Sequence, residues 1–303
     1  MAEQLRIGYV PVSKSNRSEQ TTEHFSTPIH FAQKYFNLNA NLIPYPSGTG
    51  HMIQSLQAKE IDIGIGLTEG WVAGLGKLKD TPTSQLPYRI VGTYVETPLC
   101  WAISSGSDRA DITSVQDLKG KKIGVSRIGS GSYVMGFVLA DQHSWLEAGK
   151  TPFEIVVLDT FKNLRDAVNS KKADFFMWEH FTSKRYYDNK EIKRVGEIYT
   201  PWSSWKIVAS KPEDPRIEDM TKAINKGVEY FLGHQDEAVE YISTELDYSK
   251  EDAVEWLKTV KFSGDVKGAD EKVIQKTVDI LKKAEVLDGK GTGVGEMIAV
   301  KRS

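Results

Sequence analysis

Two short loops of small residues have the composition of anion-binding turns. They are Ser47-Gly48-Thr49-Gly50 and Gly129-Ser130-Gly131-Ser132, and each leads into an expected helix. The first backbone N–H groups of a helix, together with its dipole, favour a phosphate, sulfonate or carboxylate. Arg127 precedes the second loop and could pair with such an anion or remain solvated. We expect both loops to contact a ligand; the alternative is two ordinary turns with helix caps.

Two glutamates follow segments that have the pattern of buried strands. Glu69 comes after the alternating run 61–65, next to Thr68, and Glu179 comes after the apolar run 173–176. A carboxylate accepts two hydrogen bonds, so it suits a ring nitrogen with a neighbouring exocyclic amine, as in an aminopyrimidine. We expect Thr68 and both glutamates at the ligand site. The alternative is a solvated carboxylate or a salt bridge.

Four tryptophans lie at predicted strand ends or at a predicted chain crossing: Trp71, Trp178, Trp202 and Trp205. Their rings could stack on a flat heterocycle. Packing around a hinge is the better interpretation for any one of them. We nevertheless expect at least one of the four to line the site, and we place Trp71, Trp178 and Trp202 among the ligand-binding residues.

The side chains that most often carry catalysis or bind metals form no recognisable pattern. Cys100 is the only cysteine and stands beside Trp101 in an apolar run, so we expect a small buried hydrophobe without a histidine to activate it. His51 and His180 lack a partner pattern and are expected at the surface or behind the site. The sequence predicts no catalytic residue, no metal and no cofactor, and a binding protein is favoured over an enzyme.

Composition indicates a globular protein without a charged binding face. The 303 residues contain 39 Lys and Arg against 41 Asp and Glu, so no basic excess favours nucleic acid or an anionic membrane. No apolar run is long enough to span a bilayer, and residues 1–4 lead into an expected strand without a secretion signal. We expect a cytoplasmic protein with a small-molecule ligand and no membrane insertion.

Strands and helices alternate along the chain in two similar series. The first series has strands at 5–10, 40–44 and 61–65 with helices between them, and the second opens with a strand at 122–125. Helix-linked strands of this kind form parallel, doubly wound sheets. The segments 48–69 and 160–179 repeat the same order of turn, helix, Lys-Glu-Ile-Asp or Lys-Lys-Ala-Asp, strand and glutamate. In the helix 28–36 we expect Tyr35 and Phe36 to face inward.

Two long extended runs, 89–104 and 200–210, fit segments that pass from one lobe to the other. The first is interrupted at Pro98, and mostly helical sequence follows the second. We therefore predict an α/β protein with two doubly wound lobes joined by two crossing strands and a helical C-terminal region. Lobe I would comprise residues 1–97 and 207–303, and lobe II residues 98–206.

The order of three motifs, LRIGYVP, GTGHMIQSLQAKEIDIGIG and VQDLKGKKIGVSRIGSGS, resembles type II periplasmic binding proteins. The similar branch binds nitrate, sulfonates and thiamine pyrimidine precursors and includes the fungal thiamine-pyrimidine synthases; the chain resembles a cytosolic, Candida-type yeast member. The resemblance implies lobes that close over a ligand, with a hinge near Thr97-Pro98 and Ser203–Trp205. It also places Gly129–Ser132 at the phosphate loop of the synthase.

Two departures separate this sequence from the synthase. The position of the synthase's consumed histidine falls at Gly70, and its cysteine-rich run is absent. We therefore expect a non-catalytic protein that clamps an anionic or heteroaromatic metabolite, such as a thiamine pyrimidine precursor, between two lobes. The alternatives are an enzyme of thiamine-pyrimidine metabolism on the same fold and the mature substrate-binding protein of a sulfonate or nitrate transporter.

Overall fold

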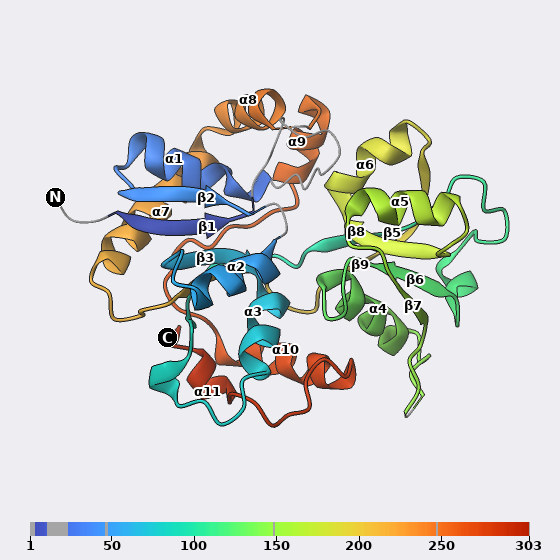
Figure 1. Cartoon of the computed structure of the whole chain (residues 1–303). Coiled ribbons are helices and arrows are strands. Elements are labelled where there is room, and N and C mark those ends of the chain that lie inside the picture. The colour runs from blue at the N-terminus through green and yellow to red at the C-terminus, as the bar shows by residue number, and fades with distance from the viewer. Residues whose placement is uncertain (1–3, 11–23, 46–47, 148, 247, 303) are drawn as a thin grey trace. The chain divides into compact units, whose positions relative to one another are not determined.

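The computed structural model forms two compact units (Figure 1). It describes residues 4–10, 24–45, 48–147, 149–246 and 248–302. Unit 1 comprises Met1–Thr97, Trp202–Asp279 and Leu287–Ser303, and unit 2 comprises Pro98–Pro201 and Ile280–Val286. Compared with the division expected from sequence, residues 202–206 belong to unit 1 and residues 280–286 to unit 2.

Unit 1 contains a five-stranded mixed sheet in the order β2-β1-β3-β10-β4. Its strands are β1 (Leu5–Tyr9), β2 (Ala40–Pro44), β3 (Ile63–Leu67), β4 (Arg89–Val95) and β10 (Trp205–Ala209). The strands β1, β2 and β3 are parallel, and β10 pairs antiparallel with both β3 and β4. The strand that returns from unit 2 therefore lies inside the sheet and not at its edge.

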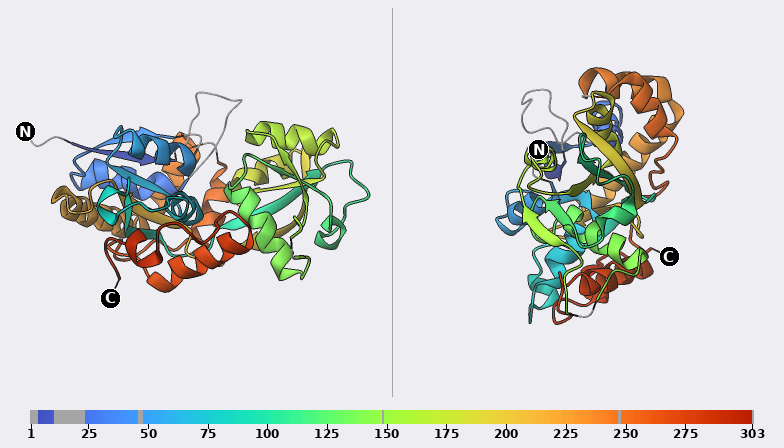
Figure 2. Two further views of the ribbon diagram at one scale, coloured as in Figure 1. Left: turned by 60° about the horizontal axis from the view of Figure 1, so that its bottom comes forward. Right: turned by 90° about the vertical axis from the view of Figure 1, so that its right-hand side faces the viewer.

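Unit 2 repeats this plan in the order β7-β6-β8-β5-β9. Its strands are β5 (Cys100–Gly106), β6 (Lys122–Val125), β7 (Glu154–Val157), β8 (Phe175–Glu179) and β9 (Ile192–Tyr199). Again three strands are parallel, and the crossing strand β5 pairs antiparallel with β8 and β9. Figure 2 shows both sheets from two further directions.

Helices connect and cover the strands in both units. Those of unit 1 are α1 (Thr27–Tyr35), α2 (Thr49–Gln57), α3 (Thr68–Gly76), α7 (Arg216–Gly233), α8 (Gln235–Glu245), α9 (Lys250–Leu257) and α11 (Val294–Met297). Those of unit 2 are α4 (Gly131–Gln142), α5 (Phe161–Asn169) and α6 (His180–Asp188); α10 (Glu271–Lys283) ends in the segment assigned to unit 2. Within the described residues, none of the helices combines the length and the apolar composition needed to cross a bilayer.

In each unit an aspartate just before a parallel strand, β3 or β8, holds the neighbouring strand, β1 or β6. In unit 1, Asp62 Oδ2 accepts the backbone N–H of Arg6 at 2.9 Å, and the N–H of Asp62 donates to the Arg6 carbonyl at 2.9 Å. In unit 2, Asp174 and Lys122 exchange the same two bonds at 2.8 and 2.9 Å. Each aspartate also pairs with an arginine at 2.7 Å, Arg6 or Arg109. We call this arrangement the aspartate clamp.

Glycines in β1 and β3 let two helices pack directly on the unit 1 sheet. A Cβ atom on Gly64 would lie 2.6 Å from the Trp71 ring, and one on Gly66 would lie 2.7 Å from Thr49 Oγ1. The close approach buries Trp71 completely against the sheet. Trp71 therefore belongs to the core of unit 1, with its ring edge-to-face on Tyr88 at 5.3 Å.

Most predicted elements are confirmed, and three expectations are corrected. The predicted α/β fold of two doubly wound lobes is present, with each sheet made mixed by its crossing strand. The residues after β3 form the first turn of α3, which begins at Thr68. Tyr35 is 40% exposed because α1 meets its neighbours with Ile29, Phe31 and Ala32 instead. Strand β9 was not anticipated, because its sequence includes three charged residues on an edge strand.

Removing the clamp aspartate of unit 2 should destabilise the protein. Asp174→Ala leaves the Lys122 N–H and one side of the buried Arg109 without an acceptor, whereas Asp111 still pairs with Arg109. We expect a loss of about 2 kcal/mol in the free energy of unfolding. Asp166→Ala, which removes an exposed helical pair with Lys162, is the control and should leave stability unchanged. Equal urea midpoints for the two variants would contradict the structural role of the clamp.

Candidate functional site

The strand order identifies one end of each sheet as the expected ligand position. In sheets that begin with the order 2-1-3, ligands bind beyond the carboxyl ends of the first and third strands, where the connections diverge to opposite faces. In unit 2 these strands are β6 and β8, which pair directly. In unit 1 they are β1 and β3. We call these two positions the switch points.

The segment after β6 brings a charged residue and two buried hydroxyls to the switch point of unit 2. Ser130 caps the twelve-residue helix α4, and its Oγ lies 2.9 Å from Ser132 Oγ. Both serines are buried, whereas Arg127 is exposed. Gly129 has a φ of 77°, which favours glycine at this turn. The structure thus groups Arg127, Gly129, Ser130, Gly131 and Ser132 at the start of a helix, as the sequence predicted.

Glu179 ends β8 and caps its own helix, α6. Its two carboxylate oxygens accept the backbone N–H groups of Phe181 at 3.0 Å and Thr182 at 2.6 Å, and Thr182 Oγ1 donates at 2.8 Å. Burial raises the pKa of Glu179 to about 7, against the opposing effect of these donors. The side chain is therefore a buried helix cap, which is neither the solvated carboxylate nor the salt bridge given as alternatives from the sequence.

Glu69 has a different environment at the switch point of unit 1. The Trp202 indole N–H donates to its Oε2 at 3.0 Å, and no other residue in the described part of the chain offers Oε1 a hydrogen bond. Burial raises the pKa of Glu69 to about 7, although the indole and the residue's own backbone N–H act in the opposite direction. A buried carboxylate with an unused oxygen can accept a ligand donor.

Thr68 fastens this end of β3 to the returning chain. Its N–H donates to the Ser204 carbonyl at 2.9 Å, and its hydroxyl donates to the Ser203 carbonyl at 2.6 Å. The Ser203 hydroxyl accepts from Lys206, a fully buried lysine whose pKa burial lowers to about 7. The sequence analysis missed Lys206, although a lone lysine inside the strand pattern 205–209 was a visible signal. Buried ionisable groups with displaced pKa values often mark functional sites.

The first predicted loop has a structural role in unit 1. Ser47 lies outside the described residues, and Gly48 precedes α2 with a φ of 73°. The Thr49 hydroxyl is buried and accepts the Leu67 N–H at 3.0 Å, so it joins the start of α2 to the end of β3. This loop follows β2, one strand away from the switch point, so its position favours support of β3 over direct ligand contact.

The tryptophans divide between packing and the switch point. Trp71 is a core residue, and Trp205 is buried with its ring stacked on Phe25 at 5.3 Å. Trp178 is half-buried and stacks on Phe161 at 4.9 Å. Trp202, through its bond to Glu69, is the tryptophan most closely tied to a switch-point residue.

The expectation that Cys100 has no histidine nearby is wrong. Cys100 is half-buried, and its Sγ donates to Glu197 Oε2 at 3.6 Å. His180, at the start of α6, has a ring nitrogen within 4.8 Å of both the sulfur and a Glu197 oxygen. Burial raises the pKa of the Cys100 thiol to about 12, with smaller effects from neighbouring side chains. The thiol is therefore protonated at neutral pH and is not a thiolate nucleophile there.

Comparison with known proteins identifies the family. A family model described as Ca3427-like PBP matches residues 101–198. The structure of the Candida albicans CA3427 gene product, described as defining a new family with the generic periplasmic binding protein structural fold, is 44% identical. That match covers 94% of this chain and 91% of the other, with a TM-score of 0.81. The chain belongs to the Ca3427-like family. The resemblance to periplasmic binding proteins and to a Candida member, stated from the sequence, is confirmed.

More distant structures share the fold of this Ca3427-like protein. The alkanesulfonate-binding protein SsuA of Xanthomonas axonopodis pv. citri, bound to MOPS, is 15% identical with a TM-score of 0.72, and the match covers 97% of each chain. The periplasmic aliphatic sulphonate binding protein SsuA of Escherichia coli is 14% identical with a TM-score of 0.70, and 98% of this chain and 92% of that one are covered. No curated protein sequence matches the chain significantly.

The two buried glutamates should respond differently to an isosteric amide. In the folded protein each carboxylate has a pKa of about 7, so it keeps its proton to a higher pH than in the unfolded chain. The free energy of unfolding should therefore fall as the pH rises from about 4.5 to 7. Glu69→Gln keeps an acceptor for the Trp202 indole and removes the buried charge. At pH 8 it should therefore raise the melting temperature, with a gain of at most about 3 kcal/mol in the free energy of unfolding. At pH 4 the difference from the parent should vanish.

Glu179→Gln removes the same charge but also one of two capping acceptors, which costs about 1–2 kcal/mol. Its stabilisation at pH 8 should therefore be clearly smaller than that of Glu69→Gln. Thermal melts of both variants between pH 4 and 8 make the comparison. A larger gain for Glu179→Gln would contradict the hydrogen bonding assigned to the two carboxylates.

Proposed function

We propose that this Ca3427-like protein is a non-catalytic binding protein that clamps an anionic or heteroaromatic metabolite between its two lobes by hinge closure. The observation that carries the proposal is the Arg127–Ser132 segment at the switch point of unit 2. It combines Arg127, which is exposed as a residue but whose pKa is lowered by partial burial, with two buried hydroxyls 2.9 Å apart and the start of a twelve-residue helix. Unpaired N–H groups in the first turn and the helix dipole favour a phosphate, sulfonate or carboxylate there.

The switch point of unit 1 favours a ligand that also carries hydrogen-bond donors. Glu69 offers a buried oxygen without another partner, beside an indole that could border a flat ring. A carboxylate of this kind suits a ring N–H or an exocyclic amine. Glu179 is less suited to the same task, because its oxygens already accept three hydrogen bonds. A thiamine pyrimidine precursor with an anionic group would combine both features.

A sulfonate is the simpler ligand that the proposal accommodates. It would need only the donors of the Arg127–Ser132 segment and no donor to Glu69. The SsuA structures of Xanthomonas and Escherichia coli, described as alkanesulfonate- and aliphatic sulphonate-binding proteins, support this ligand class through their shared fold. The two classes are separated by their dependence on Glu69.

A thermal-shift panel tests the proposal. The probes are hydroxymethylpyrimidine, its phosphate, formylaminopyrimidine, thiamine, short alkanesulfonates, nitrate and bicarbonate. A ligand at 100 times its dissociation constant should stabilise the protein by about 2.7 kcal/mol. At about 2–4 °C per kcal/mol, the melting temperature should rise by several degrees. Absence of a shift with every probe would contradict binding of these ligand classes.

Ser130→Ala should weaken binding of the anion about 10- to 100-fold, since a hydrogen bond to a charged group contributes about 1.5–3 kcal/mol. The substitution also removes the N-cap of α4. The matched control is therefore Thr160→Ala, which removes the N-cap of α5 in the same unit but lies after β7, away from the switch point. Equal dissociation constants for the two variants would show that the Ser130 segment does not hold the ligand.

A further inference from the structure

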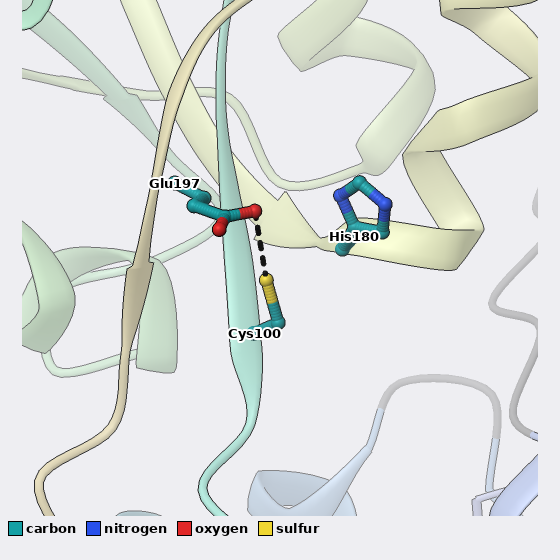
Figure 3. A group of neighbouring side chains, drawn as sticks. All are labelled: Cys100, His180 and Glu197. Atoms are coloured by element: carbon teal, nitrogen blue, oxygen red, sulfur yellow. Dashed lines mark hydrogen bonds between the residues drawn. The ribbon is translucent and has the colours of Figure 1, made fainter. Parts of the chain in front are cut away.

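Three potential metal ligands meet at the carboxyl edge of the unit 2 sheet (Figure 3). They are the Cys100 thiol, the His180 imidazole and the Glu197 carboxylate. One ligand atom from each lies within 4.8 Å of the other two. In Figure 3 the carboxylate and the sulfur face each other, and the imidazole stands beside them.

Strand register brings these residues together from three neighbouring segments. Cys100 opens β5, which lies between β8 and β9. Its partner β9 carries Glu197 opposite Ala102, two positions along the same face. On the other side, Trp101 lies opposite Glu179 at the end of β8, so His180 comes next and lies level with Cys100. All three residues belong to unit 2. Their proximity is set by regular backbone pairing and not by a loop.

The donor set and its dimensions suit a small divalent transition-metal ion. Tetrahedral zinc has Zn–S near 2.3 Å and Zn–N and Zn–O near 2.0–2.2 Å, which places its ligand atoms about 3.3–3.6 Å apart. The 3.6 Å separation of Cys100 Sγ and Glu197 Oε2 already meets this requirement. Thiolate and imidazole together select zinc-like ions over magnesium or calcium, which prefer oxygen.

We propose that Cys100, His180 and Glu197 form a binding site for a zinc-class divalent cation. The three side chains supply three ligands and leave a fourth position for water or an anion, the pattern of an open zinc site. Binding transfers the thiol proton to solvent, and the thiolate and carboxylate then balance the two positive charges of the ion. The site is made of other residues than the Arg127–Ser132 segment and does not depend on the proposed function.

Two neighbouring side chains, Arg194 and Tyr199, affect metal binding at this site. Arg194 forms an ion pair with Glu197 through Oε2, the same oxygen that accepts from the Cys100 thiol, so the guanidinium must share or release this oxygen when the ion binds. A cation next to Arg194 is repelled, and removal of that charge should strengthen metal binding. Tyr199, opposite Cys100 in β9, also hydrogen bonds with the thiol and must release it when the metal binds.

Cobalt(II) titration of the full chain, followed by competition with zinc, tests the proposal. The parent protein should bind one equivalent of Co²⁺ with a thiolate-to-cobalt charge-transfer band in the near ultraviolet and the strong visible bands of a tetrahedral ion. One equivalent of Zn²⁺ should abolish both. Absence of the charge-transfer band at millimolar Co²⁺, or a band that zinc does not displace, would overturn the site.

Variants assign the ligands. Cys100→Ser should abolish the charge-transfer band, while His180→Ala and Glu197→Gln should each weaken Co²⁺ binding at least 10-fold. His143→Ala, a histidine of the same unit stacked on Trp145, is the matched control and should bind Co²⁺ like the parent. Arg194→Ala should bind more tightly than the parent. Unchanged Co²⁺ affinity in Glu197→Gln, whose circular dichroism verifies folding, would overturn the three-ligand site even if the buried variants fail to fold.

Discussion

The aspartate clamp is the constraint on which the arrangement of each unit depends. Asp62 and Asp174 come directly before β3 and β8. Each exchanges two hydrogen bonds with the backbone of the neighbouring strand, β1 or β6, and pairs with an arginine. A slip of one residue would move every side chain of the third strand to the opposite face of the sheet. By fixing this pairing, the clamp places the ends of the first and third strands side by side. The switch points follow directly from that placement.

The crossing strands then add chemistry that the parallel strands lack. The segment leading into β10 brings Trp202 to Glu69 and Ser203 to Thr68, and β10 itself buries Lys206. In unit 2, β5 brings Cys100 between His180 and Glu197. Each antiparallel strand begins at the carboxyl edge of its sheet, so its first residues join the residues that follow the third strand. The two units thus share a plan but carry different functional groups.

Much of this could be predicted from the sequence because local signals agreed with the fold. The repeated Lys-x-x-Asp segment before each third strand indicated two similar lobes, and both of its lysines adopt the same left-handed backbone, with φ of 61° at Lys59 and 62° at Lys171. Thr160, the first residue of the repeated segment 160–179, caps α5 by accepting the Asn163 N–H. Small residues marked the start of α4 for the same physical reason.

The missed features depend on contacts between distant segments. Glu179 and Glu69 look equivalent in sequence, yet the first ends a strand of five residues and the second lies two residues beyond one, inside α3. That offset turns Glu179 into a helix cap and leaves Glu69 with an unused oxygen. The cluster of Cys100, His180 and Glu197 depends on the pairing of three strands. One of them, β9, was missed from the sequence because of its charged residues. Sequence spacing carries no information on such a register.

Hydrogen exchange with and without hydroxymethylpyrimidine phosphate tests the central claim, that ligand is held at the switch points, most directly. In the first turns of α3 and α4 the Thr68 N–H donates to Ser204 and the Tyr133 N–H donates to Ser130. First-turn N–H groups without such an acceptor should exchange quickly until a ligand orders them. The account predicts that the ligand adds protection in peptides covering 127–134 and in peptides covering 68–72, and that both effects appear over the same range of ligand concentration. Protection confined to other segments, such as the amino edges near Asp62 and Asp174, would contradict it.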